Sequence, residues 1–127
     1  MVRMIVAGSR GFDDYGYLSE KLDGIIEEIH DEIEIVSGGA KGADSLGEQY
    51  AEERGIPVKQ FAPDWKRFGK SAGFRRNREM LDYAKEEQTV VVAFWDGESK
   101  GTADTIKKAR MDGVDTRIFF YFGMGDD

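Results

Sequence analysis

The sequence predicts an α/β domain in which a five-stranded parallel sheet is covered by helices on both faces. Apolar runs rich in Val and Ile alternate along the chain with amphipathic stretches of helical type. The expected strands cover residues 3–7, 33–36, 58–61, 89–94 and 116–121, and the expected helices cover residues 17–31, 43–54, 72–87 and 102–112. Strands that alternate with helices form right-handed βαβ units, which require a parallel sheet.

Local signals support these elements in turn. The opening run "MVRMIVAGS" is too short for a secretory signal and is typical of a first strand. Leu18, Leu22 and Ile25 follow the spacing of one buried helix face, and Gly55 and Gly113 each stand between a helix and a strand, as C-terminal caps do. The expected architecture is therefore a Rossmann-like three-layer sandwich. It forms one domain over residues 1–122, followed by a flexible tail at 123–127.

The composition excludes several classes of function. The chain of 127 residues has no cysteine, which rules out disulfides, thiolate nucleophiles and cysteine-ligated metals. Its one histidine, His30, argues against a multi-histidine zinc site. No apolar run approaches the roughly 20 residues of a membrane span, so we expect a cytoplasmic protein without a membrane partner.

The charge is unevenly distributed. The net charge of −7 argues against nucleic acid as a general partner, because the overall field repels phosphate. Six of the 18 basic residues nevertheless fall in the stretch "KRFGKSAGFRRNR" at 66–78, which contains no acid. This concentration predicts a local anion site, although a solvated surface cluster would give the same pattern.

The four loops that follow the first four strands carry most of the glycines, small hydroxyls and charges. They read "GSRGFDDYG", "SGGAKGAD", "APDWKRFGKSAGFRRN" and "WDGESKGTAD", whereas the loops at the opposite edge are short and plain. Ligands of doubly wound sheets bind beyond the carboxyl ends of the strands. The sequence therefore places its function at this one edge.

Glycines before helices in the second and fourth of these loops predict a phosphate site. The free N–H groups at a helix start accept an anion, and glycine lets the backbone approach it. Neither loop is a Walker A motif or a dinucleotide fingerprint. We expect the backbone of Gly38 and Gly39, not Lys41, to hold the phosphate. Tight turns, with Asp44 or Thr102 acting only as helix caps, are the alternative.

The third loop supplies positive charge, and the neighbouring loops supply polar and aromatic groups. Arg76 and Lys70 would neutralise the phosphate, and Asp96 would contact ribose or base. The aromatic residues of these loops could stack on a base, although such a residue is more often part of the core: Trp65, Phe68, Phe74 and Trp95. Trp95 is the favoured stacking aromatic, because it lies past a strand end. The residues expected to bind the ligand are Gly8, Ser9, Arg10, Ser37, Gly38, Gly39, Asp44, Lys70, Arg76, Asn77, Trp95, Asp96, Gly101 and Thr102. The carboxylates at this edge could also hold Mg²⁺ beside a phosphate, and no other cofactor is expected.

The segments "GSRGF", "SGGAKGAD", "DWKRFGKSAGFRRNREM" and "AFWDGESKGTADTI" together resemble the YspA/YpsA-related branch of the SLOG superfamily. These Rossmann-like proteins are common in bacteria and phages, and the superfamily includes the Lonely Guy phosphoribohydrolases and the DNA-processing protein DprA. The resemblance implies the strand order 3-2-1-4-5 and a nucleotide or nucleotide-derived ligand. Many relatives are dimers, so a homodimer is expected. Under this order "RIFFYF" (117–122) is an edge strand, which could mark a subunit contact or be covered by helices.

The resemblance also bears on catalysis. Lonely Guy enzymes cleave the N-glycosidic bond of a nucleotide with an Arg–Lys pair and a Glu. Here Arg76 matches the Arg, whereas Asn77 replaces the Lys and Thr105 stands in the place of the Glu. In an enzyme of this kind, Asp96 or Asp104 would have to supply the acid. The favoured hypothesis is therefore nucleotide binding, followed by N-glycosidic hydrolysis and, more weakly, single-stranded DNA binding.

Overall fold

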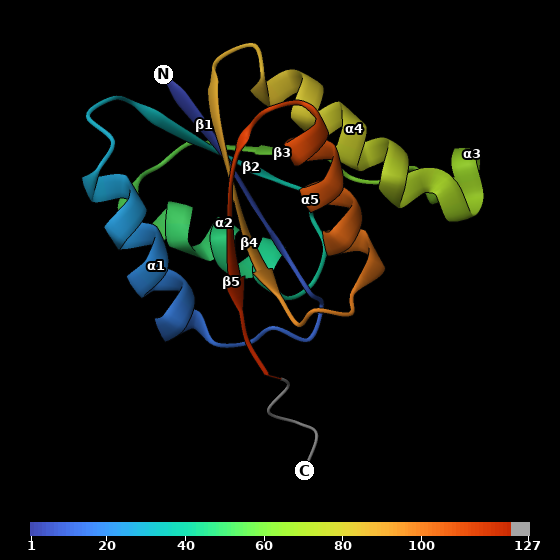
Figure 1. Ribbon diagram of the computed structural model, residues 1–127, viewed down its shortest axis with the longest axis horizontal. Helices are drawn as coiled ribbons and strands as arrows, with labels where there is room; N and C mark the ends of the chain where they lie inside the picture. Colours follow the sequence, from blue (N-terminus) through green and yellow to red (C-terminus); the bar gives the residue numbers. More distant parts are fainter. Residues whose placement is uncertain (123–127) are drawn as a thin grey trace.

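The computed structural model describes residues 1–122 and confirms the α/β prediction (Figure 1). Five strands form one parallel sheet, and the connecting segments are helical. In chain order the elements are β1 Val2–Gly8, α1 Tyr15–Glu27, β2 Ile33–Ser37, α2 Ala43–Arg54, β3 Val58–Gln60, α3 Trp65–Phe68, the 3₁₀ turn η1 Gly69–Ser71, α4 Ala72–Ala84, β4 Gln88–Trp95, α5 Lys100–Met111 and β5 Asp115–Phe120. The flexible tail predicted at 123–127 lies outside the described residues.

The strand order is β3-β2-β1-β4-β5, as the family resemblance implied. The central strand β1 pairs in parallel with β2, with Val2 opposite Ile33, and with β4, with Gly8 opposite Phe94. After β1 the chain builds outward to β2 and β3 on one side, and it later returns to build β4 and β5 on the other. The order thus reverses between β1 and β4, and the two strands end side by side at the edge where ligands of such sheets bind.

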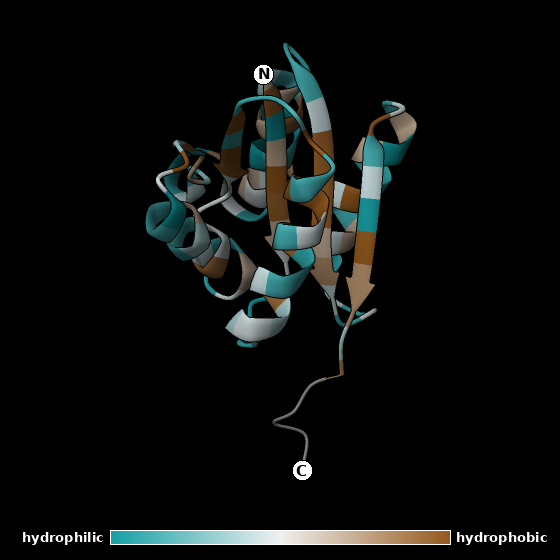
Figure 2. Ribbon diagram, turned by 90° about the vertical axis from the view of Figure 1, so that its left-hand side faces the viewer, coloured by the Kyte–Doolittle hydropathy of each residue, from teal (hydrophilic) through white to brown (hydrophobic). Residues whose placement is uncertain are grey.

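Two apolar cores enclose the sheet. On one face, α1 and α2 pack on alternate side chains of the central strands, including Met4 and Val92. On the other face, α4 and α5 pack on Ile5 and Val91. Figure 2 shows the hydrophobic residues concentrated in the central strands, as expected of a sheet buried on both faces. This burial fixes the positions of the loops at the carboxyl ends of the strands.

The helix boundaries differ from the predicted ones where the last turn tightens. The first helix ends at Glu27 rather than at residue 31, because the N–H groups of Glu28 and Ile29 bond three residues back, to Ile25 and Ile26. The helix predicted to reach residue 87 ends at Ala84, whose carbonyl accepts a hydrogen bond from the Thr89 hydroxyl at 2.6 Å.

The short helix α3 was not predicted. Asp64 caps it by accepting a hydrogen bond from the Arg67 N–H at 3.1 Å. Four residues are too few to display helical periodicity. The one signal for this helix in the sequence was therefore Asp64, a residue type that caps helices, directly before Trp65. With η1 it forms an arm that projects from the sheet beside α4 (Figure 1).

The edge strand β5 is partly covered. Phe119 stacks on Phe94 at 5.7 Å between ring centroids and meets Tyr17 edge-on, whereas Phe120 stays 61% exposed.

No helix among residues 1–122 is long and apolar enough to span a bilayer.

Candidate ligand-binding site

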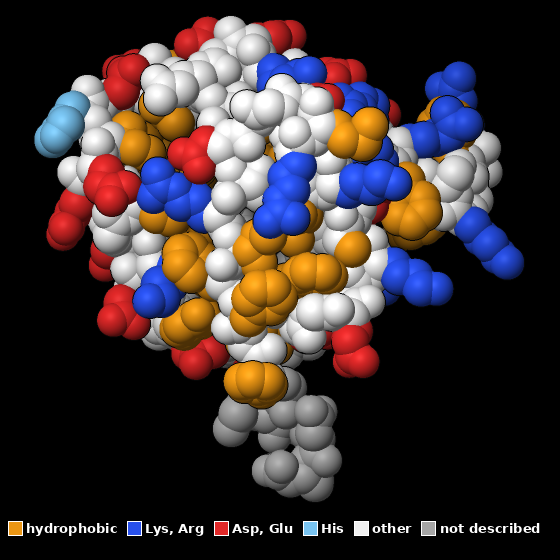
Figure 3. Space-filling view, viewed as in Figure 1, with side chains coloured by type: hydrophobic (Ala, Val, Ile, Leu, Met, Phe, Trp, Pro, Cys, Tyr) orange, Lys and Arg blue, Asp and Glu red, His pale blue; other side chains and the backbone are white. Residues whose placement is uncertain are grey.

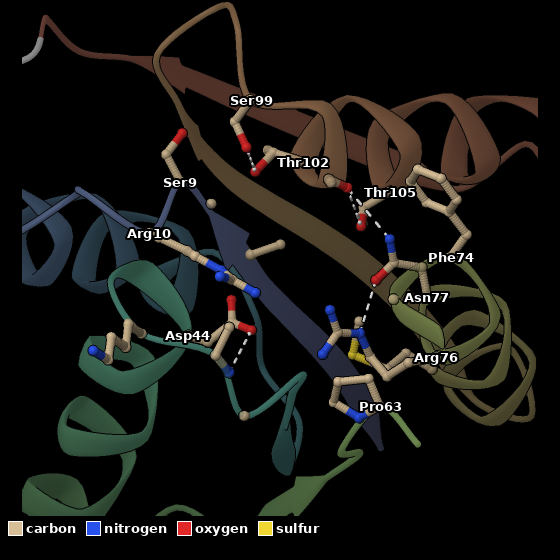
Figure 4. A pocket seen from close by; sticks show the side chains of 18 of the residues that line it. Ser9, Arg10, Asp44, Pro63, Phe74, Arg76, Asn77, Ser99, Thr102 and Thr105 are labelled. Carbon is tan, nitrogen blue, oxygen red and sulfur yellow. Dashed lines mark hydrogen bonds between the residues drawn. The ribbon is translucent and has the colours of Figure 1, made fainter. Parts of the chain in front are cut away.

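A cavity of about 780 Å³ opens at the carboxyl edge of the sheet, in the volume range of small-molecule sites. Ala7 and Gly8 at the end of β1 line it, and loops after β1, β2, β3 and β4 surround it. The first turns of α2, α4 and α5 complete the wall. Figure 4 shows side chains from these separate elements converging on one space.

Buried polar side chains gather at this edge. Among residues 1–122, the buried polar or charged residues are Ser9, Ser37, Asp44, Asn77, Thr102 and Thr105. All except Ser37 line the cavity. Burying a polar group costs free energy unless it is paired, so buried polar residues are more informative than exposed apolar ones. Their concentration marks this cavity as the candidate functional site.

Arg76 and Asp44 form the charged centre of the cavity. Arg76 donates hydrogen bonds from Nη1 to the Gly38 carbonyl and from Nε to Oδ1 of Asn77, the latter at 2.9 Å. Asp44 is 6% exposed and accepts a hydrogen bond from the Ala40 N–H at 3.2 Å. Burial raises the pKa of Asp44 to about 6, against the opposing effects of this hydrogen bond and of Arg76.

Arg10 brings a second guanidinium into the same space. Figure 4 shows the side chains of Arg10 and Arg76 pointing toward one another across Asp44. The pKa of Arg76 is lowered, first by burial and also by the positive charge of Arg10. Arg10 forms no hydrogen bond or ion pair with any of the described residues. Two converging cations that the protein leaves incompletely paired are an arrangement that an anion would stabilise.

The cavity as a whole is cationic within an acidic protein. Four basic side chains line it, Arg10, Lys41, Lys70 and Arg76, against the two acids Asp44 and Asp96. The lining therefore carries two net positive charges when both acids are ionised, whereas the chain carries −7. This local reversal of sign favours an anionic ligand.

Three of the helix starts around the cavity lack side-chain caps. Asp14 and Asp64 cap α1 and α3. In the described part of the chain, α2, α4 and α5 instead begin at Gly42, Ser71 and Ser99 without a capping side-chain bond. Uncapped N–H groups and the positive end of the helix dipole attract an anion. Residues of all three first turns line the cavity.

Gly42 holds two of these loops together. Its φ of 81° lies in the left-handed region, and a Cβ there would lie 2.3 Å from the Ser9 carbonyl oxygen and 2.6 Å from that of Arg10. The loop after β1 thus passes directly against the start of α2. This contact sets the position of Arg10 relative to Asp44.

Asn77 joins α4 to α5 below the cavity. Its Nδ2 donates to the Gly101 carbonyl at 3.3 Å and to Oδ2 of Asp104 at 3.0 Å, and its Oδ1 accepts from Arg76. Asp104 also forms an ion pair with Lys108 at 2.5 Å and does not line the cavity. The amide of Asn77 therefore orients the guanidinium of Arg76.

The structure brings most of the predicted site residues together. Those that line the cavity are Gly8, Ser9, Arg10, Gly39, Asp44, Lys70, Arg76, Asn77, Asp96, Gly101 and Thr102. Asp96 lies at the end of β4, where its Oδ1 accepts hydrogen bonds from the N–H groups of Glu98 and Ser99. These bonds, mainly the one from Ser99, lower the pKa of Asp96.

Three predicted residues lie outside the cavity lining, for different reasons. The Ser37 hydroxyl turns away and donates to Glu48 at 2.6 Å. The Gly38 carbonyl is occupied by Arg76. Trp95 donates from Nε1 to the Ser99 carbonyl at 3.0 Å, and its ring packs at a tilt against Phe120, so it supports the fourth loop from outside the cavity.

Several residues that line the cavity were not among the predicted binding residues. They are Lys41, Trp65, Phe74, Ser99 and Thr105. The sequence left Trp65 and Phe74 open as stacking residues or core residues, and they are 51% and 46% exposed. Ser99 and Thr102 share a hydrogen bond at 3.3 Å at the start of α5.

Within residues 1–122, no group of three or more His, Asp or Glu side chains is arranged to hold a metal ion.

The parallel sheet of order 3-2-1-4-5, with a cationic cavity at its switch point, defines a Rossmann-like α/β domain. Residues 2–68 match the family model described as the YspA, cpYpsA-related SLOG family. The chain belongs to this family.

Two individual proteins are similar to the chain. The Gene 61 protein of Mycobacterium phage D29 is 30% identical over 122 residues, which cover 90% of this chain and 93% of that protein. The X-ray structure of DNA processing protein A (DprA) from Streptococcus pneumoniae superposes with a TM-score of 0.50 at 18% identity. The match covers 91% of this chain and 57% of the DprA chain. This likeness concerns the fold.

Proposed function

We propose that the protein binds a nucleotide or nucleotide-derived ligand through a phosphate group held at the carboxyl edge of the sheet. The observation that carries this proposal is the convergence of Arg10 and Arg76 in a cavity that also contains most of the buried polar side chains of the described residues. A phosphate would provide the partner that Arg10 does not find within the protein. Membership in the SLOG family is consistent with such a ligand.

The phosphate would lie between the arginines and the uncapped helix starts. The first turns of α2 and α5 offer free N–H groups, and Thr102 adds a hydroxyl. Of the two glycines predicted to hold the phosphate, Gly39 lines the cavity and Gly38 does not. The Gly39 N–H donates to the Ser37 hydroxyl at 3.1 Å, so the free N–H groups of the phosphate site would be those of α2 and α5. Lys70 would add positive charge from the projecting arm.

N-glycosidic hydrolysis is the second candidate function, and one observation favours it. Asp44 lies in the cavity with its pKa raised to about 6 by burial, so it can hold or release a proton near neutral pH. The two acids expected from sequence are less suited to this role. Asp104 is bonded to Asn77 and Lys108 outside the cavity, and hydrogen bonds lower the pKa of Asp96, which keeps it ionised.

Single-stranded DNA binding receives less support. DprA is described as a DNA processing protein, but it shares 18% identity with this chain, and the chain spans 57% of its length. The net charge of −7 opposes binding of a long polyanion, whereas a cavity of about 780 Å³ suits a small one. The homodimer and the cytoplasmic location stay predictions.

A panel of nucleotides, nucleosides and inorganic phosphates tests the proposal. Thermal unfolding of the protein with each compound should show stabilisation by phosphate-bearing nucleotides, without release of free base or ribose phosphate after incubation. Release of either product would replace the binding function with hydrolysis. Absence of any stabilisation or turnover would contradict both candidates. Binding to a single-stranded oligonucleotide at low salt, but not to mononucleotides, would favour DNA.

A further inference from the structure

Trp65 and Phe74 form an exposed aromatic wall on one side of the cavity. Trp65 opens α3 and Phe74 lies in the first turn of α4, and they are 51% and 46% exposed. Both line the same cavity as the two arginines. Figure 3 shows Lys and Arg side chains gathered around this arm at the edge of the molecule, with hydrophobic surface beside them. Large aromatic side chains that are exposed in a polar cavity are typical of a site where a ligand covers them.

The position of Trp65 is set by its local contacts. Asp64 caps the short helix through the Arg67 N–H. The indole ring lies against Gly73, since a Cβ there would be 3.7 Å from Cη2 of Trp65. Its Nε1 donates to none of the described residues, whereas Nε1 of Trp95 donates to Ser99. Trp65 therefore offers both a ring face and a free donor.

The third aromatic residue of the arm serves a different purpose. Phe68 is covered by the guanidinium groups of Arg67 and Arg75, at 4.9 and 4.3 Å from its ring centroid, and it does not line the cavity. Phe74, in contrast, lies across the cavity from Arg10, beside Thr105 (Figure 4). The lining thus separates a cationic region from an aromatic one.

We infer that Trp65 and Phe74 bind the nucleobase of the ligand by stacking, so that the cavity selects nucleoside phosphates over phosphates that lack a base. This inference rests on the phosphate-binding function proposed above. A flat base of any kind presents a π-face to aromatic side chains, and stacking on them is tolerant of base identity. Arg10 and Arg76 would hold the phosphate, while the arm would recognise the rest of the molecule.

The test compares two ligands that differ only in the base. Calorimetric titration of the full chain with adenosine 5′-monophosphate and with ribose 5-phosphate gives the contribution of the base as a ratio of dissociation constants. We expect the nucleotide to bind about 5- to 150-fold more tightly. Trp65→Ala and Phe74→Ala should each reduce this ratio at least threefold and leave the affinity for ribose 5-phosphate unchanged.

Phe68→Ala is the matched control, because it removes an aromatic ring from the same arm outside the cavity. It should keep the full base-dependent ratio. In a Trp95→Phe protein, where Trp65 is the one remaining indole, the nucleotide should quench the fluorescence and ribose 5-phosphate should not. This fluorescence measurement does not use the alanine variants, so it tests the inference even if Trp65→Ala or Phe74→Ala folds poorly.

The outcomes separate this inference from the proposed function. If both ligands bind equally well, or if the ratio persists in Trp65→Ala and Phe74→Ala, the aromatic wall does not bind the base and the inference fails alone. A change in sedimentation mass in these two variants with an unaltered ratio would likewise overturn it, in favour of a contact between copies of the chain. If neither ligand binds to the native protein, the proposed function fails first.

Discussion

Arg76 and Asp44 face one another across Gly38, and no side chain at that position holds them apart. A Cβ on Gly38 would lie 2.7 Å from Nη1 of Arg76 and 2.8 Å from Oδ2 of Asp44. The buried carboxylate thereby gains a cation without a direct ion pair, and the guanidinium keeps part of its hydrogen-bonding capacity. This arrangement gives the cavity a positive centre that remains available to an anion.

Replacing Arg76 should weaken ligand binding strongly. Arg76→Ala removes a charge-assisted donor worth about 1.5–3 kcal/mol, so the dissociation constant of a nucleoside monophosphate should rise about 10- to 150-fold. Arg75→Ala is the control, since Arg75 bonds to Ser71 and stacks on Phe68 outside the cavity. Titration calorimetry on both variants checks this. Equal effects of the two substitutions would mean that only the general field of the basic segment matters.

Replacing Arg10 should separate binding from stability. Arg10 has no partner among the described residues, and its charge opposes that of Arg76. Arg10→Ala should therefore leave the free energy of unfolding unchanged or slightly increased, while the affinity for phosphate-bearing ligands falls at least fivefold. Urea unfolding and calorimetry measure the two quantities. A clear loss of stability would contradict the view that Arg10 is held ready for a ligand.

Asp44 should make stability depend on pH in an unusual direction. The pKa of Asp44 is about 6 in the folded protein and near 3.8 in the unfolded chain, so the folded state binds more protons between these values. The contribution of Asp44 to the free energy of unfolding therefore falls as the pH rises from about 4 to about 6. Relative to Asp44→Asn, the native protein should lose up to about 3 kcal/mol across this window and stay constant above it.

The comparison with Asp44→Asn isolates this group from the other carboxylates. Asp31, Asp96 and Asp112 have lowered pKa values and change stability in the opposite direction in both proteins. Urea unfolding at a series of pH values gives the difference curve. A curve that is flat from pH 4 to 7 would show that Asp44 titrates normally.

Two glycine substitutions should have opposite effects on stability. Gly42→Ala forces a Cβ to within 2.3 Å of the Ser9 carbonyl oxygen at a φ of 81°, and should cost about 3 kcal/mol or more. Gly24→Ala lies on the exposed side of α1, where a Cβ meets no atom within 4 Å, and should stabilise the protein by about 0.5–1 kcal/mol. Thermal unfolding distinguishes them. Similar effects would mean that the first loop does not need its tight contact with α2.

The sequence predicted the fold and the edge that bears the site because both follow from periodicity and topology. The alternation of Val-rich runs with amphipathic helices requires a parallel sheet, and parallel strands bring their carboxyl ends to one edge. The direction of individual side chains was harder to predict. Ser37 and Trp95 end their strands beside the cavity, yet the first bonds to Glu48 and the second to the Ser99 carbonyl.

The aromatic wall was predicted only in part, for a different physical reason. An aromatic residue in a loop is usually buried, and nothing in the sequence distinguishes Trp65 and Phe74 from Phe68. Their exposure depends on α3, a helix too short to be seen as a periodic pattern. The raised pKa of Asp44 likewise depends on tertiary burial, which the sequence did not display.

Recognition of a phosphate group on a nucleotide is the property that we expect of the cavity. The most direct measurement is calorimetric titration of the native protein with adenosine 5′-monophosphate and with adenosine, under identical buffer and salt. The phosphate should tighten binding at least tenfold, and Arg76→Ala should remove most of this gain. Equal binding of the two compounds, or binding of neither, would contradict this expectation.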